Sequence, residues 1–239
     1  MLLYLSTIAG LATTLGCLIV LLLGNPSEKI LATLLAGAGG VMLAVVTLDL
    51  LPAAASYKLP GQLVIGFGSG IFFMAASAKI LKLKYKSVPS NRRTRLKSLG
   101  FLIASGIALH DIPEGMAIAV GQEMTARLGL VIAFGIALHN LPEGMATATP
   151  LLMAGVRRKK ILALTFSIAF FTPLGAILGK LALNAVSEAL CFFLALAAGA
   201  MSFLVATELW PLAREQHPRP AFLGALSGFT IFFLISLLM

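Results

Sequence analysis

Residues 105–119 read SGIALHDIPEGMAIA and residues 134–148 read FGIALHNLPEGMATA, so two stretches that begin 29 residues apart share eleven of fifteen positions. Each stretch sets histidine and carboxyl side chains inside a run of small and aliphatic residues. Similar apolar runs recur along the chain, and about 20 apolar residues in a helix are needed to cross a hydrocarbon core of roughly 30 Å. The sequence therefore predicts an all-α membrane protein, in which residues 1–239 form a single transmembrane domain.

The overall composition supports a lipid environment. Of the 239 residues, 59% are hydrophobic and 11% are charged, and the mean hydropathy is +0.99. Because the apolar runs are unbroken and do not alternate with polar residues, helices are favoured over a β-barrel. We predict eight transmembrane helices, and these are Leu2–Leu23, Ile30–Leu51, Pro60–Leu81, Leu99–Gly121, Thr125–Leu151, Ile161–Ala182, Val186–Trp210 and Arg219–Leu238.

Basic residues gather on one side of the predicted bundle. The formal net charge is +9, and 15 of the 18 Lys and Arg residues fall on one side, many of them in a loop at residues 83–98. Only Lys58, Arg127 and Lys180 fall opposite. By the positive-inside rule the basic side is cytoplasmic and both termini lie outside, as in a multi-pass protein of a plasma membrane or bacterial inner membrane. The charges sit in short loops without interleaved aromatic residues, so we expect the lipid bilayer, and no nucleic acid, as a partner.

Internal repeats predict an inverted architecture. A second, fainter repeat links the second and seventh segments, where a methionine stands seven residues before an acid and ten before a proline. Its members are Met42, Asp49 and Pro52, and Met201, Glu208 and Pro211. In both repeats the two copies are an odd number of crossings apart, so they run in opposite directions through the membrane. Inverted repeats place the binding site of a carrier near the bilayer midplane, although a duplication kept only for packing would leave the same pattern.

Each copy of the stronger repeat can present a set of metal-binding side chains from one helix face. A histidine and a glutamate stand four residues apart in both copies, with an aspartate or an asparagine three residues before the glutamate. Residues three or four apart are neighbours on a helix surface. The candidate metal ligands are His110, Asp111, Glu114, His139, Asn140 and Glu143. His110 stands about 11 residues into its segment, about 16 Å at 1.5 Å per residue, and therefore near the bilayer centre.

Three of these candidates are acidic, and their depth makes a bound cation the simplest explanation. Asp111, Glu114 and Glu143 would each cost about 2.5–3.5 kcal/mol if they faced lipid at the bilayer centre. No Lys or Arg stands at the same depth to neutralise them. Imidazole together with carboxylate suits zinc, iron, manganese, cobalt or nickel better than magnesium or calcium, which prefer oxygen alone. Protonated carboxyl groups that are hydrogen-bonded within the bundle are the alternative.

Both copies of the motif also contain a proline. Pro113 and Pro142 have no N–H, so the carbonyl groups of Leu109 and Leu138 lose their usual helical donors and both helices should kink there. Kinked helices with freed carbonyl groups are typical of transporter sites. Kinks also occur for packing alone, so the prolines support the hypothesis of a binding site without deciding it.

These stretches resemble the paired motifs of the Zrt/Irt-like protein (ZIP) family of metal transporters. In that family the fourth segment carries a His-Asn-x-Pro-Glu-Gly motif and the fifth segment carries a related motif. The resemblance covers the whole chain and implies eight crossings, outward termini and a cytoplasmic loop after the third segment. It further implies import of a divalent metal, zinc foremost, as the transported substrate, no bound cofactor, and a homodimer.

The resemblance also implies which residues serve two neighbouring metal positions. One position takes His110, Glu114, His139 and Glu143. At the second, Asp111 and Asn140 join the two glutamates, which bridge. Many members have a glutamate before Pro-Leu-Gly in the sixth segment, whereas this chain has Thr172 there, so the second position lacks a carboxylate. Met42 aligns with a sulfur ligand of some relatives, but a buried methionine is also ordinary core packing.

Two other functions remain as alternatives to a metal transporter. The His-x-x-x-Glu pairs could belong to an intramembrane zinc-dependent hydrolase, in which bound zinc activates water. Neither His-Glu-x-x-His nor Gly-x-Ser-x-Gly occurs, and two near-identical ligand sets suit a symmetric binding site better, so we do not expect an enzyme. A carrier for organic cations would leave both histidines unexplained. We therefore expect alternating access by two inverted halves that rock around the site, with Asp49 and Glu208 either at its two mouths or simply at the membrane interface.

Overall fold

The computed structural model describes residues 1–24, 27–85, 92–185 and 190–238. In these residues every regular element is helical, and eight spans are long and apolar enough to cross a membrane. The predicted all-α class and the eight crossings are therefore confirmed. In chain order the elements are α1 (Leu2–Leu23), α2 (Glu28–Ala44), η1 (Val45–Leu50), α3 (Leu51–Ser56), α4 (Pro60–Tyr85), α5 (Arg92–Met124), α6 (Ala126–Met153), α7 (Arg158–Ile168), α8 (Phe171–Ala185), α9 (Leu190–Leu204), η3 (Val205–Leu209), α10 (Trp210–Gln216) and α11 (Pro218–Leu238).

Three crossings are built from more than one element. The second runs through α2, η1 and α3, the sixth through α7 and α8, and the seventh through α9, η3 and α10. The helix of the fourth crossing is longer than the sequence predicts. It begins at Arg92, inside the range 83–98 that is predicted to be the basic loop. Lys and Arg are good helix formers, so a helix can continue past the end of its apolar stretch. Residues 86–91 of that loop lie outside the described residues.

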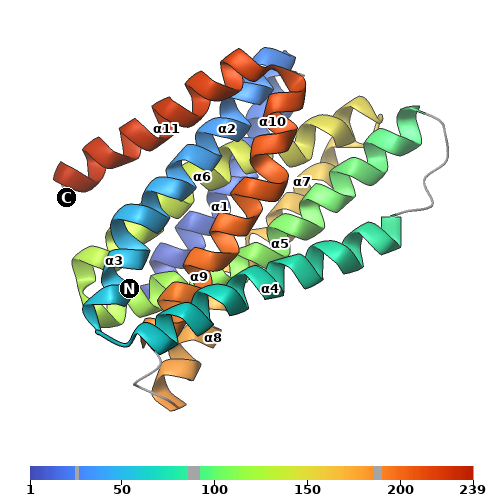
Figure 1. Cartoon of the computed structure of the whole chain (residues 1–239). Coiled ribbons are helices and arrows are strands. Elements are labelled where there is room, and N and C mark those ends of the chain that lie inside the picture. Colours follow the sequence, from blue (N-terminus) through green and yellow to red (C-terminus); the bar gives the residue numbers. More distant parts are fainter. Residues whose placement is uncertain (25–26, 86–91, 186–189, 239) are drawn as a thin grey trace.

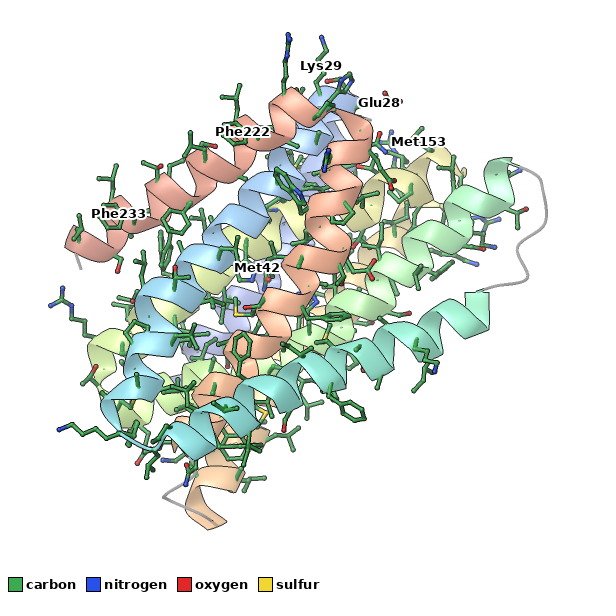
Figure 2. The ribbon with its side chains drawn as sticks, viewed as in Figure 1. Glu28, Lys29, Met42, Met153, Phe222 and Phe233 are labelled. Atoms are coloured by element: carbon green, nitrogen blue, oxygen red, sulfur yellow. The ribbon has the colours of Figure 1, made fainter. Side chains whose placement is uncertain are left out.

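Successive crossings alternate in direction and give the bundle a basic end and an opposite end. We call the end at which α2, α5 and α7 begin the basic end. Lys29 and the run Arg157–Lys160 are exposed there, and Glu28, Lys29 and Met153 lie toward it in Figure 2. Figure 1 shows α3 and the far part of α8 at the other end. Any path for a polar solute has to connect these two ends.

Glycines hold four of the crossings in one tightly packed group. A Cβ atom at Gly16 of α1 would overlap the carbonyl oxygen of Leu141 of α6, and one at Gly144 of α6 would overlap that of Thr13 of α1. The same reciprocal fit joins α5 to α8, where glycines of each helix lie against carbonyl oxygens of the other. Small residues allow such close approach of membrane helices. We call α1, α5, α6 and α7–α8 the motif block, because it carries both copies of the strong repeat.

The remaining crossings form two close helix pairs by the same means. Gly40 of α2 meets the carbonyl oxygen of Ala225 of α11, and Gly228 of α11 meets that of Gly37 of α2. Reciprocal glycine contacts also join α4 to α9. We call α2–η1–α3, α4, α9–η3–α10 and α11 the second block.

The two blocks meet without any close contact between a described glycine and a backbone carbonyl. At many described glycines an added Cβ atom would come within 3.0 Å of a heavy atom. Of these glycines, Gly135 of α6 is the one whose contacts lie in the other block. It meets the side chains of Val45 and Phe232, not a backbone carbonyl. Side chains can change rotamer more easily than helical backbone can shift. The boundary between the blocks is therefore more deformable than the glycine contacts within the helix pairs.

Two short π-helical segments lie in the second block. They are η1 in the second crossing and η3 in the seventh, and each is followed within two residues by a proline, Pro52 or Pro211. A residue without an N–H cannot maintain the regular helical ladder, and π-helical turns are one way to absorb the loss. Asp49 lies in η1 and Glu208 in η3, the positions that the faint repeat relates. The sequence identified the prolines but not the π-helical turns.

Candidate metal centre

All six candidate ligands are buried together in the middle of α5 and α6. His110, Asp111, Glu114, His139, Asn140 and Glu143 are each at most 1% exposed. Their chain neighbours Gly115 and Gly144 make the close helix contacts of the motif block, which fixes the depth and rotation of both helices. The structure thus brings every predicted site residue into one buried region, and all six lie on the same block.

His110 is the common point of the cluster. Its Nε2 atom lies 3.3 Å from Glu143 Oε2, 3.7 Å from Asp111 Oδ1 and 3.8 Å from Glu114 Oε1. Its Nδ1 atom lies 3.1 Å from the carbonyl oxygen of Gly106, so Nδ1–H donates to the backbone and Nε2 carries the lone pair. A backbone hydrogen bond of this kind is the usual way in which a ligating histidine is oriented.

These distances suit a tetrahedral ion. Zinc binds nitrogen and oxygen ligands at about 2.0–2.2 Å, so neighbouring ligand atoms of a tetrahedral site are about 3.3–3.6 Å apart. The three separations around His110 Nε2 lie at or slightly above that range. His110, Asp111 and Glu114 also offer ligand atoms that all lie within 4.8 Å of one another. A small inward adjustment of these side chains would complete the coordination shell of one ion.

His139 is arranged differently from what the family resemblance implies. Its Nε2 atom lies 2.9 Å from Glu114 Oε1, a hydrogen-bonding distance that is too short for two ligands of one tetrahedral ion. In this arrangement His139 donates to Glu114 Oε1, and Asp111 Oδ1 lies 3.7 Å from His110 Nε2. The sequence could not distinguish these roles, because both histidines have the same spacing from their glutamates.

The carboxylate oxygens of the cluster have few partners within the protein. Apart from the hydroxyl group of Thr172 beside Asp111, no donor is bonded to the oxygens of Asp111 and Glu143 or to Oε2 of Glu114, and His110 Nε2 makes no hydrogen bond of its own. Among the described residues, the buried polar side chains include no Lys or Arg. Unpaired carboxylates in a low-dielectric interior are costly. The donor set therefore fits a cation that the chain itself does not supply.

The structure adds contacts that the sequence did not suggest. Asn140 Nδ2 donates to the carbonyl oxygen of Ala9 on α1 at 3.0 Å, which leaves its Oδ1 buried without a donor. Thr172 on α8 is fully buried and lies beside Asp111. Met42 of α2 is fully buried in a hydrophobic core to which both blocks contribute, and Figure 2 shows it inside the bundle.

A cavity of about 140 Å³ reaches the cluster from the basic end. His110 and Glu143 lie at its inner limit, and its walls come from both blocks, including Leu35, Ile107 and Glu208. The wall residues on α5 are His110 and residues before it, and those on α6 are Glu143 and a residue after it. Because α5 begins and α6 ends at the basic end, the cavity lies on the basic side of the cluster. Asp49 does not line this cavity and lies in η1 toward the opposite end.

Comparison with known proteins places the chain among metal transporters. A model of the ZIP zinc transporter family matches residues 84–236. The chain is 35% identical over 260 residues to the zinc transporter ZupT of Chlorobium phaeovibrioides, which covers 99% of this chain and 97% of the relative. It is 31% identical over 245 residues to that of Streptococcus mutans, with 95% and 93% covered, and 35% identical over 243 residues to one from Escherichia coli, with 96% and 93% covered. The region matched by the family model contains both buried motifs, and the relatives align with nearly the whole chain, so the chain belongs to the ZIP family of zinc transporters.

Proposed function

We propose that this protein imports divalent transition-metal ions, zinc foremost, through the buried cluster of α5 and α6. The observation that carries the proposal is the set of three buried carboxylates around His110 Nε2, with no buried Lys or Arg among the described residues to pair with them. Relatives named zinc transporters at 30–35% identity support zinc as the substrate. Proteins of this family are transporters, so the hydrolase alternative falls away.

The six site residues divide into three roles under this proposal. His110, Glu114 and Glu143 bind the transported ion, and Asp111 completes its coordination. His139 holds Glu114 in place through the hydrogen bond at 2.9 Å. Asn140 faces the neighbouring position with its free Oδ1 atom.

The cavity assigns a direction to the conformation described. If the basic end is cytoplasmic, as the positive-inside rule requires, the centre is open inward and both termini lie outside. On the other side of the centre the helices are packed with apolar residues, among them Ile118, Ile136 and Leu50, all fully buried. An ion released from His110 and Glu143 would pass Glu208 on its way to the basic end.

The units that move are the two blocks and not the two halves of the sequence. All six site residues lie on the motif block, and the cavity lies along its boundary with the second block. A rigid shift of the motif block against the second block would close this cavity and open one toward the other end, which is alternating access. The deformable side-chain contacts of the boundary favour such a shift over bending within either block.

The helix pairing supports the inverted repeats on which this mechanism draws. The symmetry of the strong repeat relates α5 to α6. Through reciprocal glycines, α5 packs on α8 and α6 packs on α1. The symmetry of the faint repeat relates the second crossing to the seventh. Through glycine contacts, the second crossing packs on α11 and the seventh packs on α4. Each repeat therefore relates one glycine-packed helix pair to another pair of the same kind. A transporter with related inward and outward states would have this relation.

Metal flux in reconstituted vesicles tests the proposed function. Purified protein in liposomes should admit zinc, with manganese, iron, cobalt, nickel and magnesium compared at equal concentration. Glu114→Ala should abolish the flux because it removes a carboxylate of the centre. Glu123→Ala is the matched control, since Glu123 lies on the same helix but is exposed and paired with Lys180 at 2.6 Å. Normal flux through Glu114→Ala, or no zinc flux in the unmodified protein, would refute the proposal.

A further inference from the structure

The sixth crossing begins with four consecutive basic residues at the basic end of the motif block. The run Arg157–Lys160 is exposed throughout, and the membrane span itself starts within it, at Arg158. Arg93 of α5 lies against the turn before the run, where its Nε atom donates to the carbonyl oxygen of Ala154 at 2.8 Å. These charges therefore gather at the level where the helix leaves the hydrocarbon core.

No acidic side chain of the motif block offsets the charge of the run. The acids of this block are the three buried carboxylates of the candidate metal centre and Glu123, which lies at the opposite end in an ion pair with Lys180. The side chains of the run form no ion pair with any described residue. The helix α2, which also begins at the basic end, instead carries Glu28 beside Lys29. Like charges at close range repel one another, so an anion from outside the chain would stabilise the run.

The helix that follows the run exposes an apolar face to the bilayer. Phe166 is 47% exposed and Phe170 is 53% exposed, whereas Thr165 is fully buried on the other side of the helix. Lys159 stands seven residues before Phe166, which is two helical turns and about 10 Å, and it therefore lies on the same face. A charged group above an apolar strip matches the two parts of a phospholipid, its headgroup and its acyl chains.

We propose that this side of the sixth crossing binds an anionic phospholipid, with the headgroup at the run Arg157–Lys160 and an acyl chain along Phe166 and Phe170. Clusters of about four to eight Lys or Arg residues next to a membrane helix are typical of binding to anionic headgroups. A free phosphate ion or a nucleic acid would match the charges but would leave the apolar face without a partner. Because α7 belongs to the motif block, the lipid contacts the block that carries the metal centre. The inference goes beyond metal transport and does not depend on it.

Tryptophan fluorescence at the apolar face tests this contact. The chain has one tryptophan, Trp210, so Trp210→Phe together with Phe166→Trp leaves a single reporter on α7. In vesicles, brominated phosphatidylglycerol should quench this reporter more strongly than brominated phosphatidylcholine at the same mole fraction, because the run concentrates the anionic lipid beside it. Salt at about 1 M should remove the difference, since it screens charges beyond about 3 Å.

Charge variants of the reporter protein test whether the run binds the headgroup. Lys159→Gln should lower the preference for the anionic lipid about fivefold, the factor that one basic residue contributes near an anionic surface, and Lys159→Arg should keep it. Lys29→Gln is the matched control, because Lys29 is exposed at the same end but lies beside Glu28. Glutamine at all four positions of the run should abolish the preference, while most basic residues stay on the same side and maintain the orientation.

Three results would overturn the inference. They are equal quenching by both lipids, a preference that is unchanged when the whole run is neutralised, and displacement of the anionic lipid by inorganic phosphate at equal ionic strength. The last result would assign the run to a soluble anion and not to the membrane. None of these results would alter the proposed metal transport, which is measured separately as zinc flux.

Discussion

The hydrogen bond between His139 and Glu114 separates the arrangement in this structure from the one that the family resemblance implies. In the structure His139 Nε2 donates to Glu114 Oε1 at 2.9 Å, whereas His110 Nε2 is the atom that three carboxylates surround. A residue that only orients a ligand can be replaced by another donor of similar reach. Glutamine has such a donor in its side-chain amide, while alanine has none.

Replacing His139 should therefore have graded effects on zinc affinity. Loss of a group that orients a metal ligand typically weakens metal binding 10- to 100-fold, about 1.4–2.7 kcal/mol, so we expect that loss for His139→Ala. We expect His139→Gln to recover most of it, because the amide can still donate to Glu114. His110→Gln should not recover, since the amide cannot replace the lone pair of Nε2 as a nitrogen ligand.

Competition with a coloured zinc chelator measures these affinities on purified protein, and the thermal unfolding midpoint of each variant controls for folding. If His139 were itself a ligand, His139→Gln would bind zinc as weakly as His139→Ala and as weakly as His110→Gln. That result would refute the positioning role and restore the ligand set implied by the family resemblance.

Three further predictions follow from the same geometry. Glu143→Ala should nearly abolish zinc uptake, whereas Asn140→Ala should only reduce it or alter metal selectivity, as measured at matched surface expression; equal losses would contradict the division of roles. Zinc binding requires neutral imidazole and ionised carboxyl groups, so the zinc dissociation constant should fall as pH rises from 5.5 to 8, and a flat profile in chelator titrations would show that the empty site holds no exchangeable proton. Gly144→Ala should lower the free energy of unfolding by about 1–3 kcal/mol, because its methyl group meets the backbone of Thr13, while Gly61→Ala, with open space around it, should be nearly neutral in thermal unfolding.

The sequence predicted which polar side chains lie together because short-range geometry determines their positions on each helix. The four-residue spacing of histidine and glutamate places both on one helix face, and the repeat supplies a second such face at similar depth. The structure brings all six of these residues together in the bundle. Their function as metal ligands is still a proposal, and zinc binding to the variants above decides it.

The roles of individual side chains could not be predicted in the same way. Whether Asp111 or His139 lies beside His110 depends on how α5 and α6 are rotated against each other, which is set by contacts between distant residues such as Asn140 and Ala9. The beginning of α5 at Arg92 was missed because the end of an apolar run is not the end of a helix. The π-helical turns η1 and η3 were missed because a proline permits several local responses, and the packing around it selects one.

The two sequence repeats lie on different blocks of the bundle. The strong repeat, with its histidines and glutamates, lies on α5 and α6 of the motif block. The faint repeat, with its acids and prolines, lies on the second and seventh crossings of the second block. The proposed ligands therefore stand on one block, whereas the cavity that reaches them has walls from both blocks. Under the proposed mechanism, relative motion of the blocks would open the centre to either end without changing the coordination of the ion, so a strict coordination geometry and a mobile path are compatible in one small bundle.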